Sequence, residues 1–161
     1  MRKAYPWFAL AAAVVAADQL TKWLLQAALH PGERYPVTGF FNLVLVFNRG
    51  AAFSLLARAP GWQTPLFAAI AVAAIVVVSV LLLRTSGRRL YCAGLALILG
   101  GAIGNLIDRL RYGYVVDFLD LHALGWHWPA FNAADSAITV GAALLILDSF
   151  VHARRASDER A

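Results

Sequence analysis

The chain alternates between long apolar stretches and shorter polar segments, and this pattern predicts helices that cross a membrane. A bilayer core of about 30 Å requires roughly 20 apolar residues for one helical crossing. Stretches of about this length occur at residues 7–29, 65–83, 90–107 and 134–151. We therefore predict an all-α membrane protein with four transmembrane helices, folded as a single domain over residues 1–161.

Composition supports this interpretation, because 61% of the 161 residues are hydrophobic and only 14% are charged. A water-soluble fold of this size cannot bury so much apolar surface. The first stretch also has features of a cleavable signal peptide, since Arg2 and Lys3 precede it and small residues occupy 15–17. The apolar character resumes after Lys22 and three more stretches follow, which favours a retained helix.

Basic residues predict the orientation, because Lys and Arg collect in short cytoplasmic segments. Five arginines lie in the two long loops, residues 30–64 and 108–133, which we expect to face outward. Eight basic residues lie near the termini and between the second and third stretches: Arg2, Lys3, Arg84, Arg88, Arg89, Arg154, Arg155 and Arg160. Both termini are therefore predicted to be cytoplasmic. The scattered positive charge favours anionic phospholipid headgroups as partners and argues against nucleic acid.

The first outer loop contains a short segment with strand character. Residues 40–47 are rich in aromatic and β-branched side chains, which predicts a strand at the membrane surface, closed by Asn48. Residues 51–57 are apolar and long enough for two turns of a short interfacial helix. Tryptophans at the same level form a predicted aromatic belt: Trp62, Trp126 and Trp128.

Neither a metal nor a cofactor is expected. Cys92 is the single cysteine, so it forms no internal disulfide and is predicted to pack within the third stretch. The histidines lack the short helical spacing of metal ligands: His30, His122, His127 and His152. Glycines at 100, 101 and 104 lie inside an apolar stretch, which indicates close helix packing rather than a phosphate loop.

Acidic residues near the membrane are the candidates for chemistry, because an ionisable group there needs a partner or a function. Asp18 precedes Lys22 by four residues, which predicts an ion pair on one helix face. Asp120 is predicted to be a solvated loop residue. Asp117 and Asp135 are embedded among apolar residues at the outer ends of the third and fourth stretches, where both can face one pocket.

Two carboxylates in one pocket do not readily ionise together, so one keeps a proton while the other can accept a proton from water. This is the chemistry of an aspartic peptidase, in which nearby donors stabilise the developing oxyanion. Candidate donors are Asn48, Asn105, Arg109 and Asn132. The alternative is that Asp135 caps the fourth helix and Asp117 ends a loop, and spacing alone leaves both interpretations open.

Four ordered segments resemble the signature blocks of the lipoprotein signal peptidase family, also called signal peptidase II: residues 48–53 (NRGAAF), 104–109 (GNLIDR), 115–118 (VVDF) and 131–136 (FNAADS). The resemblance extends over nearly the whole chain and includes Asp18-Gln19. It implies that Asp117 and Asp135 form a catalytic pair. It further implies that Asn48, Asn105, Arg109 and Asn132 line the site, that Asp18 shapes it from below, and that Asp108 supports Arg109.

The same resemblance implies a substrate and a location. The substrate would be a bacterial prolipoprotein whose lipobox cysteine carries a diacylglyceryl group, with cleavage just before that cysteine. The enzyme would be a monomer without cofactors in the cytoplasmic (inner) membrane, with its active site near the periplasmic face. Residues 40–57 would cover the bound peptide, with Gly50 and Gly61 as hinges.

Other functions are also compatible with parts of the pattern. A Ser-Lys peptidase would pair Lys22 with Ser54 or Ser136, but Lys22 already has Asp18 beside it. A small transporter would use Asp18, Asp117 and Asp135 as a proton path, although nothing resembles paired inverted repeats. A purely structural membrane protein fits the composition but does not explain the polar residues grouped in the outer motifs.

Overall fold

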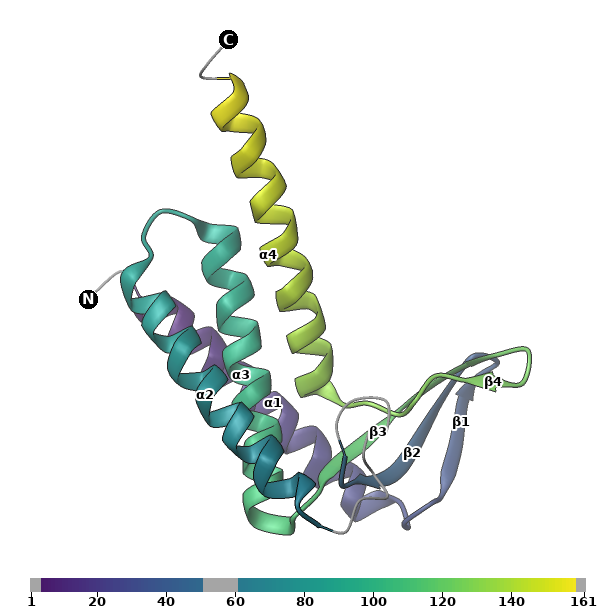
Figure 1. Cartoon of the computed structure of the whole chain (residues 1–161). Helices are drawn as coiled ribbons and strands as arrows, with labels where there is room; N and C mark the ends of the chain where they lie inside the picture. The colour runs from purple at the N-terminus through teal and green to yellow at the C-terminus, as the bar shows by residue number, and fades with distance from the viewer. Residues whose placement is uncertain (1–3, 51–60, 159–161) are drawn as a thin grey trace.

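The computed structural model describes residues 4–50 and 61–158 (Figure 1). One pair of strands follows the first helix, and a second pair follows the third helix. The elements are α1 (Tyr5–Ala28), β1 (Arg34–Thr38), β2 (Phe41–Asn48), α2 (Gln63–Arg84), α3 (Arg89–Tyr112), β3 (Val115–Ala123), β4 (Trp126–His127) and α4 (Ala133–Asp158). The predicted interfacial helix at 51–57 lies outside the described residues.

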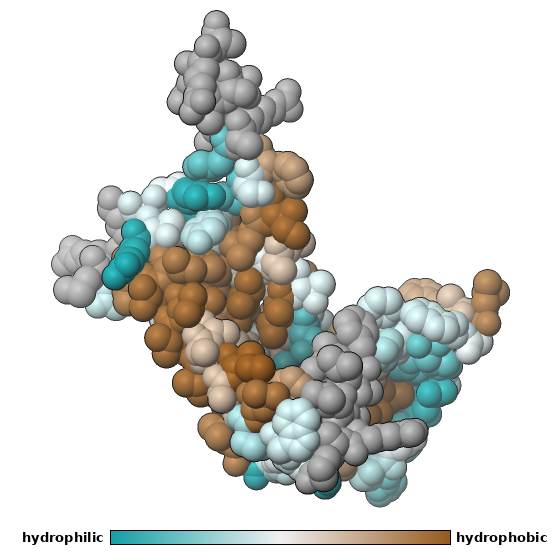
Figure 2. Space-filling model, in the orientation of Figure 1, coloured by the Kyte–Doolittle hydropathy of each residue, from teal (hydrophilic) through white to brown (hydrophobic). Residues whose placement is uncertain are grey.

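The four predicted spans are confirmed as helices. Within the described part of the chain, four helices are long and apolar enough to cross a membrane, and they are α1, α2, α3 and the 20-residue segment Ala133–His152 of α4. On the face shown in Figure 2, apolar side chains form a broad band over the helices. The outward face of α2 is typical, because Val72, Val76 and Val77 are all exposed. Such a face is stable in contact with lipid.

Helix α3 extends further than the sequence predicted. Its last turn ends at Tyr112, and Gly113 follows with a left-handed φ of 77°, donating its N–H to the carbonyl of Arg109. Glycine is favoured there because the left-handed conformation is strained for other residues. Asp108 and Arg109, which we had assigned to the loop 108–133, therefore lie on a rigid helix.

Helix α3 is the centre of the helical bundle. It packs against α1, α2 and α4, and half of the residues in its apolar segment are buried, a larger share than in the other three helices that can span a membrane. Small residues permit the close approach, since a Cβ atom on Gly94 would lie 2.7 Å from the Gly141 carbonyl of α4. Cys92 is buried in the core beside Leu82, Leu95 and Leu99, as predicted.

The outer segments form an antiparallel sheet with strand order β1-β2-β3-β4. Strand β2 confirms the predicted strand and ends at Asn48. Strand β3 was not predicted, and it lies where we expected a loop. Val46 pairs with Asp117 in the β2–β3 register.

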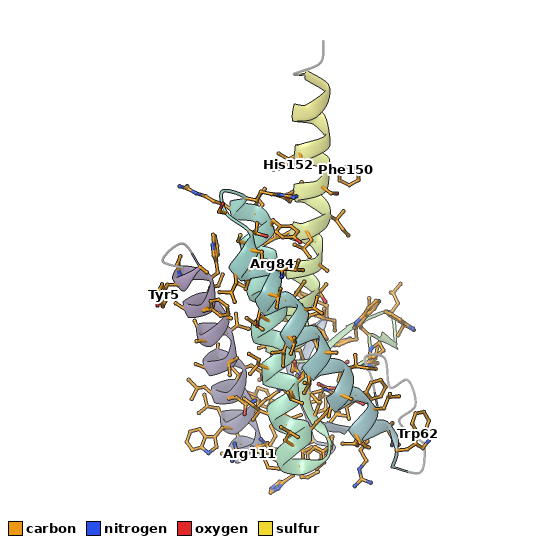
Figure 3. All side chains as sticks on the ribbon, turned by 60° about the vertical axis from the view of Figure 1, so that its left-hand side comes forward. Tyr5, Trp62, Arg84, Arg111, Phe150 and His152 are labelled. Carbon is orange, nitrogen blue, oxygen red and sulfur yellow. The ribbon has the colours of Figure 1, made fainter. Side chains whose placement is uncertain are left out.

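The sheet lies at one end of the bundle, and the chain ends lie at the other (Figure 1). Figure 3 shows the same polarity, with Tyr5, Arg84 and His152 toward one end and Trp62 and Arg111 toward the opposite end. Both termini therefore lie on the same side of the helical bundle.

Candidate active site

Asp117 is the first carboxylate of the site and comes from β3. The first residues of this strand are buried between the sheet and the helices, and the Asp117 side chain is only 2% exposed. Its Oδ2 accepts a hydrogen bond from Asn48 Nδ2 at 3.0 Å, and its Oδ1 accepts one from Asn132 Nδ2 at 2.7 Å. Two amide donors therefore hold the carboxyl group in a fixed orientation.

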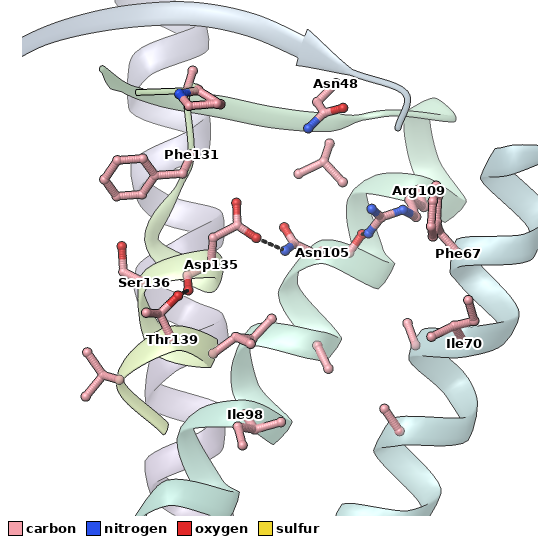
Figure 4. A pocket seen from close by; sticks show the side chains of 18 of the residues that line it. Asn48, Phe67, Ile70, Ile98, Asn105, Arg109, Phe131, Asp135, Ser136 and Thr139 are labelled. Atoms are coloured by element: carbon pink, nitrogen blue, oxygen red, sulfur yellow. Dashed lines mark hydrogen bonds between the residues drawn. The ribbon is translucent and has the colours of Figure 1, made fainter. Parts of the chain in front are cut away.

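Asp135 is the second carboxylate and lies in the first turn of α4. Asn132 precedes this helix and caps it, because its Oδ1 accepts the backbone N–H of Asp135 at 2.9 Å. The alternative that Asp135 itself is the cap is therefore wrong. The carboxylate of Asp135 therefore points away from its own helix, and its Oδ1 accepts a hydrogen bond from Asn105 Nδ2 of α3 at 2.8 Å (Figure 4).

Asn132 connects the two carboxylates. Its side chain is fully buried, and its Nδ2 lies within hydrogen-bond distance of Asp117 Oδ1, the Val116 carbonyl and Asn105 Oδ1, so that its two hydrogens are shared among three acceptors. Its Oδ1 accepts the backbone N–H of Asp135. The side-chain amides of Asn105 and Asn132 therefore join Asp117 to Asp135 through hydrogen bonds. The structure brings together five of the predicted site residues through hydrogen bonds: Asp117, Asp135, Asn48, Asn105 and Asn132.

The environment of Asp117 favours its protonated form. Burial raises its pKa, the nearby charge of Asp135 raises it further, and Asn48, Lys22 and Asn132 lower it, which leaves a pKa of about 7 instead of the usual 3.8. Near neutral pH, the pair can therefore hold one proton while carrying one negative charge.

A buried ionic cluster lies beneath the pair. Lys22 Nζ contacts Asp18 Oδ2 at 2.8 Å and Asp108 Oδ2 at 2.9 Å, and all three side chains are almost completely buried. Asp18 Oδ1 also accepts the Ala134 N–H, so Asp18 satisfies a free donor at the start of α4 from the neighbouring α1. The predicted Asp18–Lys22 ion pair is confirmed.

Asp108 has contacts beyond the predicted support of Arg109. Besides Lys22, its carboxylate accepts hydrogen bonds from Gln19 Nε2 at 3.0 Å and from the Val116 N–H at 3.0 Å. Asp108 thus joins α1, α3 and β3. Charges inside apolar stretches need partners, so the sequence indicates that Lys22 is paired. The four-residue spacing identifies Asp18 as one partner but does not identify Asp108 as the second.

Arg109 and Asn48 frame the outer side of the site. The Arg109 guanidinium lies 5.6 Å from the Phe67 ring centroid and donates to the carbonyls of Asn105 and Gly50, each at 3.3 Å. Asn48 Oδ1 accepts the Gly50 N–H at 2.9 Å. Both side chains line the same cavity as Asp135 (Figure 4).

This cavity has a volume of about 730 Å³ and lies between α2, α3 and α4. Its outer end is polar and contains Asn48, Asn105, Arg109 and Asp135. Its deeper part is lined by apolar side chains from the three helices, including Ile70, Ala74, Ile98, Ala102 and Ile138. A long apolar ligand can therefore occupy the groove while its polar end meets Asp135, the carboxylate that lines it.

Asp120 is buried, so the prediction of a solvated loop residue is wrong. It is 3% exposed, and its carboxylate accepts Asn42 Nδ2 at 2.8 Å and contacts His127 Nδ1 at 2.9 Å and Arg34 Nε at 3.4 Å. Burial raises the pKa of Asp120, but hydrogen bonds from Asn42 and His127 and the charges of His127 and Arg34 outweigh it and lower the pKa overall.

The described residues do not assemble a Ser-Lys pair. Lys22 contacts Asp18, Asp108 and Asn105, and the Ser136 hydroxyl donates to the Asn132 carbonyl at 2.9 Å. Ser54 lies outside the described residues. Across residues 4–50 and 61–158, no three His, Cys, Asp or Glu side chains gather as a metal-binding group.

Solved structures with a similar fold are membrane enzymes, in agreement with the four membrane-spanning helices and the carboxylate site described above. One structure, described as a bacterial membrane enzyme at 2.3 Å resolution, superposes with a TM-score of 0.81 and 29% identity, covering 90% of this chain and 87% of its own. A second, described in the same words at 1.9 Å resolution, gives a TM-score of 0.77 and 30% identity, covering 88% and 90%. The chain is a multi-pass membrane protein with the fold of bacterial membrane enzymes.

Sequence comparison identifies the family. The family described as Signal peptidase (SPase) II matches residues 10–151. A lipoprotein signal peptidase of Paraburkholderia phytofirmans is 57% identical over 149 residues, covering 92% of this chain and 87% of the relative. One from Ralstonia nicotianae is 56% identical over 150 residues, covering 93% and 87%. This chain belongs to the signal peptidase II family, and it is a protease that processes lipoproteins.

Proposed function

We propose that this chain is an intramembrane aspartic endopeptidase that removes the signal peptide from diacylglyceryl-modified prolipoproteins, cutting just before the lipidated cysteine. The observation that carries the aspartic mechanism is the linkage of a buried carboxylate, Asp117, and a half-buried one, Asp135, through one asparagine, with donors on each carboxylate. Asp117 and Asp135 are the catalytic residues of this proposal, and water is the nucleophile.

The reaction requires one proton on the pair at the start, and the proposal places it on Asp117, whose pKa is raised. The Asp135 carboxylate takes a proton from water, and the resulting oxygen attacks the scissile carbonyl carbon. Asp117 transfers its proton to the carbonyl oxygen. When the C–N bond breaks, Asp135 protonates the leaving amine and the diol returns a proton to Asp117, so the enzyme is regenerated.

The groove supports the proposed substrate. Its apolar walls accept acyl chains or a signal-peptide helix that arrives laterally from the bilayer, and its polar end then places the scissile bond at the carboxylates. Arg109 and Asn48, at the outer end, are positioned to hold the peptide backbone through their donors. The curated relatives, which are named lipoprotein signal peptidases, support a lipid-modified protein as the partner.

The location follows from the same reasoning. The basic connection between α2 and α3 lies at the end where the chain termini lie, so this end is proposed to face the cytoplasm. The sheet and the carboxylates would then lie at the outer face of the cytoplasmic membrane. The enzyme is proposed to act as a monomer without cofactors.

The deciding experiment is cleavage of a diacylglyceryl-modified prolipoprotein by the purified enzyme and by Asp117→Asn and Asp135→Asn. Each substitution keeps the shape of the side chain and removes its acid-base chemistry, so we expect losses of at least about 100-fold. Asp148→Asn is the matched control, because Asp148 is also buried but pairs with Arg88 at the opposite end of the helices. Retained cleavage by both site variants would show that the carboxylates are structural.

A further inference from the structure

Lys22 is a buried cation that the proposed chemistry does not use. Its side chain is 2% exposed, and it lies in the C-terminal third of the membrane-spanning helix α1, where an unpaired buried charge is very costly. An ammonium group has three hydrogen-bond donors and no acceptor. The three donors of Lys22 meet Asp18 Oδ2, Asp108 Oδ2 and Asn105 Oδ1, the last at 3.1 Å.

The contact with Asn105 has a consequence for the carboxylate pair. Because Lys22 can only donate, the Asn105 atom that faces it must be the oxygen, and the Asn105 NH₂ group must then face the other way. In that direction lies Asp135 Oδ1, at 2.8 Å. The same oxygen of Asn105 also accepts the NH₂ group of Asn132, which reaches Asp117 at 2.7 Å.

The backbone N–H of Asp135 fixes the orientation of the second side-chain amide, that of Asn132. The Asp135 N–H can only donate, so the Asn132 atom facing it is also an oxygen. With both oxygens turned toward donors, both amides present their N–H groups to the carboxylates. If Asn105 were turned over, its oxygen would face Asp135 and its NH₂ group would face Lys22, which are two repulsive contacts in place of two hydrogen bonds.

We propose that Lys22 is a positioning residue for the catalytic pair, which acts by fixing the orientation of the Asn105 amide so that Asn105 and Asn132 donate to Asp135 and Asp117. The proposal rests on the function proposed above. Asp18 and Asp108 hold the ammonium in place, and Arg109 on the other side of Asn105 contacts its backbone carbonyl rather than its side chain. Lys22 is therefore the charged group that contacts the side-chain oxygen of Asn105.

The test is a double-mutant cycle between Lys22→Met and Asn105→Ala, measured as kcat and KM on the same diacylglyceryl prolipoprotein. Methionine keeps most of the length of lysine and removes its charge and donors. We expect Lys22→Met to lower kcat by about 10- to 100-fold per folded molecule and to change KM by less than about threefold, because the effect is on the pair and not on the groove. In the Asn105→Ala background, the same substitution should lower kcat by less than about threefold, since its effect passes through Asn105.

Arg88→Met is the matched control, because it breaks the ion pair with Asp148 far from the site. Its effects should add to those of Asn105→Ala. If Lys22→Met is poorly folded, Asp18→Asn/Lys22→Met is used in the same cycle, because it removes one negative charge together with the positive one. The folded fraction of each variant is determined by thermal unfolding.

Two results would overturn the proposal: an unchanged kcat in folded Lys22 variants, or a double variant whose loss equals the product of the single losses. Both are distinct from failure of the proposed function. That failure would appear as absence of cleavage by the wild type, or as retained cleavage by the Asp117→Asn and Asp135→Asn variants.

Discussion

Asn132 shows why an amide is needed at one position of the site. Its oxygen caps α4 by accepting the Asp135 N–H at 2.9 Å, and its nitrogen donates to Asp117 at 2.7 Å. A carboxylate supplies only the first function, because it has no donor when ionised. Asparagine and aspartate are comparable as helix caps, so substitution between them separates the two functions.

We therefore expect Asn132→Asp to keep the helix cap and lose activity. The new oxygen would face the Val116 carbonyl oxygen without a hydrogen atom between them, and Asp117 would lose the NH₂ donor that holds it. This repulsion should lower kcat/KM by at least about 100-fold, in line with loss of the proton arrangement of the pair. Far-UV circular dichroism should show the helices intact. Near-wild-type cleavage by Asn132→Asp would contradict the role assigned to its NH₂ group.

The raised pKa of Asp117 predicts a basic limb in the pH profile. The pKa of about 7 exceeds the usual 3.8, so Asp117 keeps its proton through mildly acidic conditions and loses it as the pH rises through 7. The doubly ionised pair lacks the acid that protonates the carbonyl oxygen. We expect kcat/KM to fall by about tenfold per pH unit above this pKa, as for any single essential acid. A profile flat to pH 9, with the protein still folded, would show that Asp117 is not this acid.

At the scale of elements, a β-hairpin brings the two carboxylates together. Asp117 lies on β3, and the returning chain pairs Phe131 with Leu119 just before Asn132 begins α4. The N–H of Leu119 donates to the Phe131 carbonyl at 2.8 Å, and the reverse bond is 3.1 Å. The distance between Asp117 and Asp135 is thus set by strand pairing, which is more rigid than a loop.

Asp120 fastens this hairpin to the rest of the sheet. It lies on β3 and binds Asn42 of β2, Arg34 of β1 and His127 of β4, so it contacts every strand. We expect Asp120→Ala to destabilise the fold by about 1–3 kcal/mol, because buried donors lose their acceptor. Its pKa is lowered in the folded protein, so the contribution of Asp120 is present above the ordinary value of 3.8 and is lost as the pH falls below it.

The measurement is thermal unfolding of the wild type and Asp120→Ala at several pH values. The difference in Tm between them should be largest near neutral pH and should shrink below about pH 4, where Asp120 is protonated in the unfolded wild type. Glu33→Ala is a suitable control, because Glu33 is exposed and its carboxylate accepts the N–H of His30, three residues before it. Equal Tm differences at all pH values would mean that the charge of Asp120 does not contribute.

The elements differ in how well the sequence predicts them. The four helices follow from apolar length, because the bilayer requires it. Strand β2 follows from its aromatic and β-branched residues, whereas β1 contains Pro36 and β3 carries two aspartates, which strands rarely contain. These strands exist because of long-range pairing and burial, which local patterns do not reveal.

The residues of the site also differ in how well the sequence predicts their contacts. Motif resemblance selected the residues that gather around Asn132, but the ionic partners of Lys22 and Asp120 were missed or only half identified. Asp108 is 86 positions from Lys22, and Asn42 is 78 from Asp120. Spacing within one helix or strand detects neighbours at short range only, so buried polar networks that join several elements are the part that needs a structure.

At the scale of the whole molecule, the position of α3 creates both the site and its entrance. Because α3 contacts α1, α2 and α4, it forms the floor of a groove whose walls are α2 and α4. Figure 4 shows this arrangement, with Ile70 of α2 and Asp135 of α4 on opposite sides and Asn105 and Ile98 on α3 between them. An apolar groove that spans the helices is suited to a substrate that stays in the bilayer.

We expect a bulky residue in the groove to weaken binding of the lipidated substrate without altering the chemistry. Ala74→Trp adds an indole to the α2 wall, whereas Ala73→Trp adds the same group on the exposed surface of α2, outside the groove lining. Ala74→Trp should raise KM by at least about tenfold with kcat changed little, since it removes binding that the ground and transition states share. Ala73→Trp should leave both constants near those of the wild type, because an exposed indole is compatible with lipid. If both variants changed KM equally, the groove between α2 and α4 would not be the path by which the substrate reaches Asp117 and Asp135.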